Sequence, residues 1–189
     1  MKTFHFFSPQ PPDLLSLTIE GERLRLVPIS DEFEQDIFKE FTSEITLYMF
    51  PSPAEDIEGT RSFIVESRRS MQAGNNLLFA ILSKKGEFLG CCGLHAEGKV
   101  TTPELGIWLK KSVHGSGYGR EAIQTLVNWS RNNIDFDYFI YPVDRKNIAS
   151  YKIPESLGGQ IVGELKVQTP NGKILDEVVY KIDRINSII

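Results

Sequence analysis

The chain has 189 residues, of which 41% are hydrophobic and 24% charged, and 21 Lys and Arg against 25 Asp and Glu give a net charge of −4. These values are typical of one folded globular domain, and they exclude disordered, collagen-like and coiled-coil chains. The mild acidity, with no block of basic residues, argues against nucleic acid as a partner and favours cationic substrates such as amines.

The two cysteines, Cys91 and Cys92, are neighbours in an apolar stretch, a spacing that fits neither a disulfide framework nor a metal site. We therefore expect reduced core residues and no bound metal. No apolar run reaches the roughly 18 to 20 residues of a membrane-spanning helix, and residues 1–16 lack the continuous apolar segment of a secretory signal. The expected location is the cytoplasm, with no membrane partner.

Three prolines among aromatic residues indicate that residues 1–16 form an N-terminal arm, and one domain is expected over residues 17–189. Apolar and polar residues alternate over Leu17–Val27, the pattern of a half-buried hairpin or a bent strand. Helical spacing of apolar residues follows over Glu32–Phe41, with Asp31 as the expected N-cap. A second helix is expected over 57–71.

The rest of the chain alternates between period-two and helical patterns. The expected strands are Leu77–Ser83, Glu87–His95, Pro103–Lys110, Phe136–Val143, Gln160–Val167 and Lys173–Ile182, with helices after Arg120 and over Asn147–Leu157. The resulting order, β-αα-βββ-α-β-α-ββ, predicts an α/β (α+β) fold. We expect a single mixed, mostly antiparallel sheet of about seven strands with helices on both faces.

The most informative segment is a glycine-rich loop, His114–Arg120, between a strand and a helix. Three alternating glycines allow a tight turn and present several backbone N–H groups at a helix N-terminus, where the helix dipole favours negative charge. This arrangement predicts a diphosphate site. The Walker pattern G-x-x-x-x-G-K-[ST] does not occur in the chain, which excludes that class of nucleotide site.

A dinucleotide site is the alternative, because Gly117–Ala122 satisfies G-x-G-x-x-A and Asp137 and Asp144 follow at roughly the spacing of the ribose-binding acid. Two features weigh against it. Residues 110–116 separate the strand from the first glycine, and the unit comes late in the chain, after a series of antiparallel strands.

The run ELGIWLKKSVHGSGYGREAIQTLVNW, with NIASYKIPESLGG further along, resembles the acyl-CoA-binding core of the GNAT superfamily of N-acetyltransferases. The whole element order is similar to that family, and most of all to the subgroup that acetylates ribosomal-protein N-termini. The family's loop pattern is Gln/Arg-x-x-Gly-x-Gly/Ala, and here His114 takes the first place while Gly117 and Gly119 match. The resemblance implies an enzyme that transfers acetyl from acetyl-CoA to a primary amine within a ternary complex.

The resemblance also implies where acetyl-CoA, the cosubstrate, would bind. The pantetheine arm would pair with the backbone of the strand, the loop amides would hold the diphosphate, and an Asn at the start of the next helix would bind the pantetheine. These residues are Ile107, Trp108, Leu109, His114, Gly115, Ser116, Gly117, Tyr118, Gly119, Arg120, Asn147 and Ser150.

Amine attack on a thioester requires a base, donors for an oxyanion and an acid for the departing thiolate. Glu104 is the expected base, acting directly or through one water, and the resemblance implies a backbone N–H near Leu109 for the oxyanion. The subgroup's tyrosine acid would fall at Pro154, which has no proton to give. Ser150 is therefore the preferred acid and Tyr151 the second candidate.

The acceptor is left open between a protein N-terminus and a small-molecule amine, with Phe50–Pro53 expected in the acceptor-side loop and His95 as a candidate to face it. Two other function classes stay open. One is a nicotinamide-dependent oxidoreductase, and the other is a non-catalytic acyl-CoA-binding module. A homodimer is compatible with the sequence.

Overall fold

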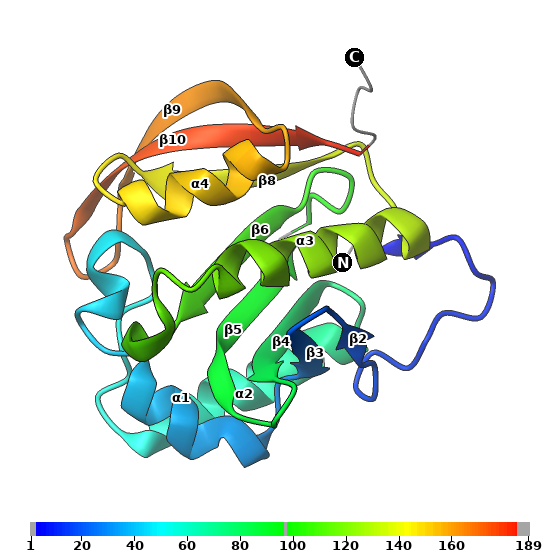
Figure 1. Cartoon of the computed structure of the whole chain (residues 1–189), viewed down its shortest axis with the longest axis horizontal. Coiled ribbons are helices and arrows are strands. Elements are labelled where there is room, and N and C mark those ends of the chain that lie inside the picture. Colours follow the sequence, from blue (N-terminus) through cyan, green and yellow to red (C-terminus); the bar gives the residue numbers. More distant parts are fainter. Residues whose placement is uncertain (1–2, 97, 185–189) are drawn as a thin grey trace.

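The computed structural model describes residues 3–96 and 98–184. Its centre is an eight-stranded sheet with strand order β2-β3-β4-β5-β6-β8-β10-β9 (Figure 1). Neighbouring strands are antiparallel except β6 and β8, which are parallel. The mixed, mostly antiparallel sheet is confirmed. It has eight strands instead of about seven because the first expected strand is a hairpin of β2 (Ile19–Glu20) and β3 (Leu24–Pro28).

Helices cover both faces of this sheet, as expected, with α1 and α2 on one face and α3 and α4 on the other (Figure 1). The remaining strands are β4 (Asn76–Ser83), β5 (Phe88–His95), β6 (Glu104–Leu109), β8 (Tyr138–Asp144), β9 (Gln160–Gln168) and β10 (Ile174–Asp183). The helices are α1 (Glu34–Glu40), α2 (Ile57–Gln72), α3 (Tyr118–Asn133) and α4 (Ile148–Ser156).

The first helix begins later than expected. Asp31 opens a 3₁₀ turn, η1 (Asp31–Phe33), and the N-cap of α1 is Phe33, whose side chain makes no capping bond. The prediction that Asp31 caps this helix is therefore wrong. The 3₁₀ turn satisfies the first backbone groups through shorter-range hydrogen bonds, so the helix needs no side-chain cap there.

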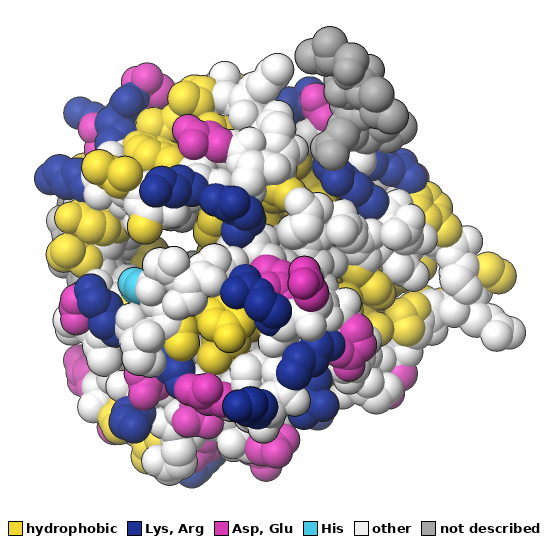
Figure 2. Space-filling model, viewed as in Figure 1, with side chains coloured by type: hydrophobic (Ala, Val, Ile, Leu, Met, Phe, Trp, Pro, Cys, Tyr) yellow, Lys and Arg dark blue, Asp and Glu magenta, His cyan; other side chains and the backbone are white. Residues whose placement is uncertain are grey.

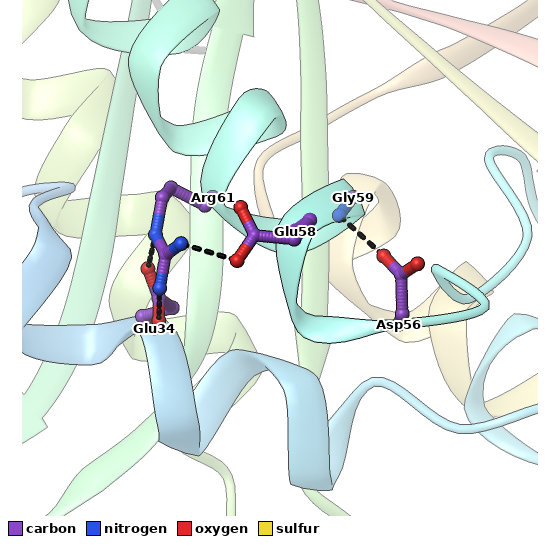
Figure 3. Close-up of polar contacts among 5 residues, drawn as sticks. All are labelled: Glu34, Asp56, Glu58, Gly59 and Arg61. Carbon is purple, nitrogen blue, oxygen red and sulfur yellow. Dashed lines mark hydrogen bonds and ion pairs between the residues drawn. The ribbon is translucent and has the colours of Figure 1, made fainter.

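An arginine fixes α1 against α2 (Figure 3). The α2 residue Arg61 donates from Nε and Nη2 to the two carboxylate oxygens of Glu34 on α1, at 2.8 and 2.9 Å, and it also pairs with Glu58. Asp56 caps α2 by accepting the Gly59 N–H at 2.9 Å. The planar guanidinium matches a carboxylate with two parallel bonds, so the pair sets the orientation of the two helices as well as their contact.

The N-terminal arm contacts the domain through residues 4–6, whereas residues 7–13 are exposed. Phe4 is buried and its N–H bonds the carbonyl of Gly74 after α2 at 2.8 Å. Strand β1 (His5–Phe6) pairs with β7 (Ile134–Asp135), which follows α3. Residues 1–2 of the arm and 185–189 of the domain lie outside the described residues.

The two halves of the sheet separate where β6 meets β8. These strands share one bridge, between Glu104 and Ile140, with the Ile140 N–H bonded to the Pro103 carbonyl at 3.0 Å. Backbone N–H groups on one side of a strand recur at every second residue, and the next one would belong to Pro142, which has none. The strands diverge from that point (Figure 1), and Figure 2 shows this face hollowed between the part that carries α3 and the part that carries α4.

Cys91 and Cys92 are free thiols in β5, each 1% exposed, and burial raises the pKa of both. Thiols with raised pKa values stay protonated, which makes them poor nucleophiles. Within residues 3–96 and 98–184, no helix has the length and apolar character needed to cross a membrane. The same residues contain no group of three or more His, Cys, Asp and Glu placed to hold a metal ion.

Candidate active site

The diverging strands β6 and β8 leave a gap between them. The glycine-rich loop lies at the wide end of this gap and leads from β6 into α3. Gly115 and Gly117 adopt left-handed backbone angles, with φ of +76° and +82°, and Gly117 is the N-cap of α3. The conformation needs glycine because a side chain in this region meets its own backbone. His114 closes the loop by placing Nε2 2.9 Å from the Leu109 carbonyl, which accepts from it. Its imidazole therefore braces the turn.

Backbone donors gather at this end of α3. The N–H groups of Tyr118, Gly119 and Arg120 belong to the first turn, where helix geometry gives them no acceptor inside the helix. The positive end of the helix dipole lies at the same place. The first turn of α3 and the left-handed glycines before it therefore fit a diphosphate, and a side chain at Gly117 would force the backbone out of this shape.

The backbone of β6 offers donors to the gap at alternate residues. Lys110 bonds through its N–H to the Leu89 carbonyl of the β5 side at 2.8 Å, so even-numbered residues of β6 face β5. The N–H groups of Ile107 and Leu109 consequently face the side where β8 has diverged. These N–H groups have no neighbouring strand on this side, as an extended pantetheine arm would require, while the Leu109 carbonyl accepts from His114.

Trp108 differs from its two neighbours. Its backbone faces β5, and its ring packs on the α1 face, with centroids 4.8 Å from Phe41 and 5.8 Å from Phe88. The structure therefore places the half-buried Trp108 ring against the core on the α1 face and not along the edge of the gap.

Helices α3 and α4 meet at Gly119. A Cβ at Gly119 would lie 3.3 Å from Ile153 Cδ1 of α4 and 3.4 Å from Leu109 Cδ1. Beside this contact a groove of about 480 Å³ opens next to the loop. Its lining residues are Glu22, Arg23, Gly117, Arg120, Glu121, Gln124 and Ser156. The exposed Arg120 thus borders both the loop and the groove.

Ser150 and Asn147 lie on the α4 side of the gap. Asn147 is the N-cap residue of α4 and its side chain makes no capping bond, while its carbonyl accepts the Ser150 N–H at 3.0 Å. Ser150 Oγ lies 2.8 Å from the hydroxyl of Tyr141 on β8. Ser150 shares a helix face with Ile153, which reaches across to Gly119. The serine hydroxyl therefore lies in a wall of the gap with a hydrogen-bonded partner behind it.

The side chain of Tyr151, next to Ser150 in the chain, points toward β10. The ring of Tyr151 packs 6.1 Å from that of Tyr180 on β10, and the Tyr180 hydroxyl reaches Glu155 at 3.4 Å. The structure thus brings Ser150 toward the gap and directs Tyr151 onto the sheet.

Glu104 stands where β6 and β8 join. It is exposed, it forms the bridge to Ile140, and His95 of β5 is its cross-strand partner. Its side chain shares a face with Gly106 and Trp108, which is the α1 face. His95 lies on that face too, since its Nε2 would be 3.1 Å from a Cβ at Gly106. Glu104 and the glycine-rich loop therefore serve opposite faces of one gap.

A set of hydrogen bonds spans the gap on the α1 face. Lys173, in the β9–β10 turn, donates from Nζ to the carbonyls of Thr46 and Met49 at 2.6 and 3.1 Å. Asn171 of the same turn donates from Nδ2 to Ser52 Oγ at 2.8 Å. We call these contacts the clasp. They tie the η2 segment (Ile45–Tyr48) and the expected acceptor-side loop to the other half of the sheet.

Sequence reasoning missed Tyr141, Arg23 and the clasp. In the sequence Tyr141 looks like an ordinary buried strand residue, and its contact with Ser150 forms only when α4 packs against β8. Arg23 lies beside the loop, with Nη1 3.1 Å from the Ser116 carbonyl, although 93 positions separate the two residues. No periodic pattern links residues so far apart.

Comparison with known proteins identifies the family. The model of the acetyltransferase (GNAT) domain matches residues 23–160, which is most of the chain. The protein belongs to the GNAT acetyltransferase family. This GNAT chain is 25% identical over 170 residues to "Uncharacterized N-acetyltransferase p20" of Bacillus licheniformis, covering 87% of this chain and 95% of the relative.

Solved structures share the GNAT fold. The acetyltransferase (GNAT family) of Bacillus anthracis superposes with a TM-score of 0.74 at 21% identity, over 89% of this chain and 99% of that one. RimL, a ribosomal alpha-N-protein acetyltransferase solved in complex with coenzyme A, gives a TM-score of 0.77 at 19% identity, over 88% and 98%. These comparisons give the dinucleotide alternative no support.

Proposed function

We propose that this GNAT acetyltransferase transfers an acetyl group from acetyl-CoA to a primary amine by direct attack in a ternary complex. The observation that carries the proposal is the gap between β6 and β8, which has an anion cradle on the α3 face and a carboxylate on the α1 face. Two substrates that enter from opposite faces would meet at the strand junction. Holding both reactants next to each other in the right orientation removes much of the entropic cost of the reaction.

Acetyl-CoA supplies a thioester carbonyl as the electrophile. The residues that would hold it are the loop amides of Gly115 to Arg120 for the diphosphate, and the side chain of Asn147 and the gap-facing backbone of Ile107 and Leu109 for the pantetheine. The same strand N–H groups are the donors available to a developing oxyanion. Backbone donors suit this role because they are fixed by the sheet before the reaction begins.

Glu104 is the proposed base. A primary amine is mostly protonated near neutral pH and must lose a proton before its lone pair can attack. Glu104 lies at the strand junction on the α1 face, where the acceptor would arrive, and can take that proton directly or through one water. His95 on the neighbouring strand shares this face and borders the same position.

Ser150 is the proposed acid, supported by Tyr141. Burial raises the pKa of Tyr141 to about 12, so its hydroxyl stays protonated at physiological pH. When Tyr141 donates the hydrogen bond to Ser150 Oγ, the serine's own hydrogen is not used in that bond. Ser150 can then give its proton to the departing sulfur. The hydrogen bond from Tyr141 thereby sets the direction in which Ser150 donates.

Replacing Ser150 by alanine is expected to lower kcat by about 100-fold, the lower end of the range for a positioned proton donor, because a thiolate leaves fairly well without one. The KM for acetyl-CoA should change less than threefold. Steady-state kinetics on S150A beside Y151F measures this. An equal loss of kcat in Y151F, or full activity in S150A, would reassign the acid.

The clasp borders the acceptor side of the gap. Because Lys173 and Asn171 join the η2 segment to the β9–β10 turn, an acceptor on the α1 face would approach the gap beside these contacts. A primary amine at the end of an extended chain suits such an approach. We therefore propose a peptide N-terminus as the acceptor, in line with the alpha-N-protein acetyltransferase activity of RimL, and a small linear amine as the second candidate.

Thermal unfolding with acetyl-CoA, CoA, NADH and ATP, followed by thiol detection over a panel of peptides and amines, tests the function. A ligand at 100 times its Kd adds about 2.7 kcal/mol of stability, or about 5–10 °C in Tm for a domain of this size. We expect that rise with acetyl-CoA and CoA alone. A rise with NADH alone would favour the oxidoreductase, and CoA binding without thiol release on any amine would favour the non-catalytic module.

A further inference from the structure

The turn between β2 and β3 is seated against the first turns of α3. A Cβ at Gly21 would lie 2.9 Å from Thr125 Oγ1 and 3.3 Å from Glu121 Oε1, so a side chain there would displace these groups. The turn also carries Arg23, which extends along α3 toward the glycine-rich loop. A segment far away in the sequence thus contacts the helix end that forms the anion cradle.

Arg23 makes four contacts there. Its backbone N–H donates to Glu121 Oε1 at 2.6 Å, its Nε to Oε2 at 2.7 Å, and its Nη1 to the Ser116 carbonyl at 3.1 Å. Its guanidinium carbon lies 4.7 Å from the centre of the Tyr118 ring. One planar group therefore holds the loop before α3 and two residues of its first turn. A lysine has a single nitrogen and cannot make all of these contacts at once.

Glu121 places a negative charge at the helix end expected to bind the diphosphate, and Arg23 offsets this charge. Its carboxylate lies in the first turn of α3, and its side chain is 15% exposed, so water screens it poorly. A negative charge there suits the helix dipole but repels an anion bound at the same helix end. The Arg23 guanidinium offsets that charge through its Nε bond to Oε2, and the Arg23 backbone N–H donates to Oε1.

We propose that Arg23 is a positioning residue for the acyl-CoA diphosphate, which neutralises Glu121 and fixes the loop whose amides bind it. This inference rests on the proposed function, because it assumes that the cradle binds CoA. It assigns Arg23 no contact with the ligand. It accounts for a carboxylate beside a diphosphate site and for an arginine attached to the loop from a distant turn.

The test is calorimetric titration of CoA into the whole chain and its variants R23M, E121Q and R23M/E121Q. Loss of one partner of a poorly screened charge pair is expected to raise the Kd of R23M by about 30-fold. E121Q should bind within about threefold of the wild type, because it removes the repulsive charge. The double variant should recover to within about fivefold, since without the carboxylate there is nothing to neutralise.

If the Arg23–Glu121 pair had a purely structural role, the double variant would have lost both partners and would bind CoA no better than R23M. That result, or R23M binding within twofold of the wild type, would overturn the inference. The R23M defect should also shrink as salt is raised, since salt screens the repulsion. R69M is the matched control, since Arg69 on α2 forms an exposed pair with Glu66 at 3.5 Å.

Thermal unfolding of each variant shows whether it is folded, and R23K, which keeps the charge, replaces R23M if that variant does not fold. R23K is expected to bind CoA about fivefold more weakly than the wild type, because lysine neutralises Glu121 but does not also bond the Ser116 carbonyl of the loop. R23K binding as tightly as the wild type would contradict the role of the planar group. Wild-type protein that does not bind CoA at all would instead refute the proposed function itself.

Discussion

Valine in place of Gly117 is expected to weaken CoA binding by at least about 100-fold, the loss produced by misplacing several charge-assisted hydrogen bonds at once. The space around Gly117 is not the cause, because the nearest atom to an added Cβ would be Arg23 Nη2 at 3.4 Å. The cause is the φ of +82°, which a β-branched residue avoids at a cost of about 1–2 kcal/mol. Valine would rotate the backbone and turn the N–H groups away from the anion.

The matched control is Gly86→Val in the β4–β5 turn. Gly86 has a φ of +86° and no atom within 4 Å of an added Cβ, so valine there meets the same strain without affecting the loop. Both variants should lose similar stability, about 2–8 °C in Tm. Calorimetric titration should then separate them, with CoA affinity retained in G86V and lost in G117V. If folded G117V binds CoA as the wild type does, the diphosphate is held elsewhere.

Local patterns in the sequence predicted much of the fold. The β4–β5 and β9–β10 hairpins and the long helices α2 and α3 follow from periodicity and from turn residues, which act over a few positions. The first hairpin was expected only as a hairpin or one bent strand, because β2 has two residues and gives almost no pattern. Asp31 failed as an N-cap for a related reason, since a 3₁₀ turn and a helix begin with the same residue types.

The gap itself has a signal in the sequence. Pro142 lies within an otherwise apolar strand, two residues after Ile140, and a proline within a strand marks an edge without hydrogen bonds. Reading that proline with the parallel pairing of β6 and β8 would have placed the divergence of the sheet. It would also have shown which wall of the gap belongs to β8.

Contacts between distant segments had no comparable signal. The clasp joins Lys173 to Thr46 across 127 positions, and Arg23 meets Glu121 across 98. Each joins a basic side chain to a polar partner, and nothing in the local sequence distinguishes Lys173 or Arg23 from a solvated charge. The choice between Ser150 and Tyr151 lies between these cases, because helical spacing relates them but only the packed sheet shows which one faces the gap.

Glutamine in place of Glu104 is expected to lower kcat/KM for the amine by about 100- to 1,000-fold near neutral pH, with CoA affinity unchanged. The amide keeps the size of the side chain and removes its capacity to take a proton. The variant would depend on amine that is already deprotonated in solution. That fraction rises tenfold per pH unit below the pKa of about 8 for a peptide N-terminus. The deficit of E104Q should therefore shrink steadily as the pH is raised from about 6.5 to 8.5.

Glu177→Gln distinguishes loss of a base from loss of negative charge on this face. Glu177 lies on the same face of the sheet on β10, opposite Asp144, and burial together with that carboxylate raises its pKa. Its replacement is expected to change KM for a cationic acceptor by a few fold at most, without altering the shape of the pH profile. If E177Q reproduced the pH dependence of E104Q, the base would lie nearer to β10. If E104Q kept the wild-type kcat/KM and pH profile, water or another residue would remove the proton, and Glu104 would be a surface residue of the strand junction.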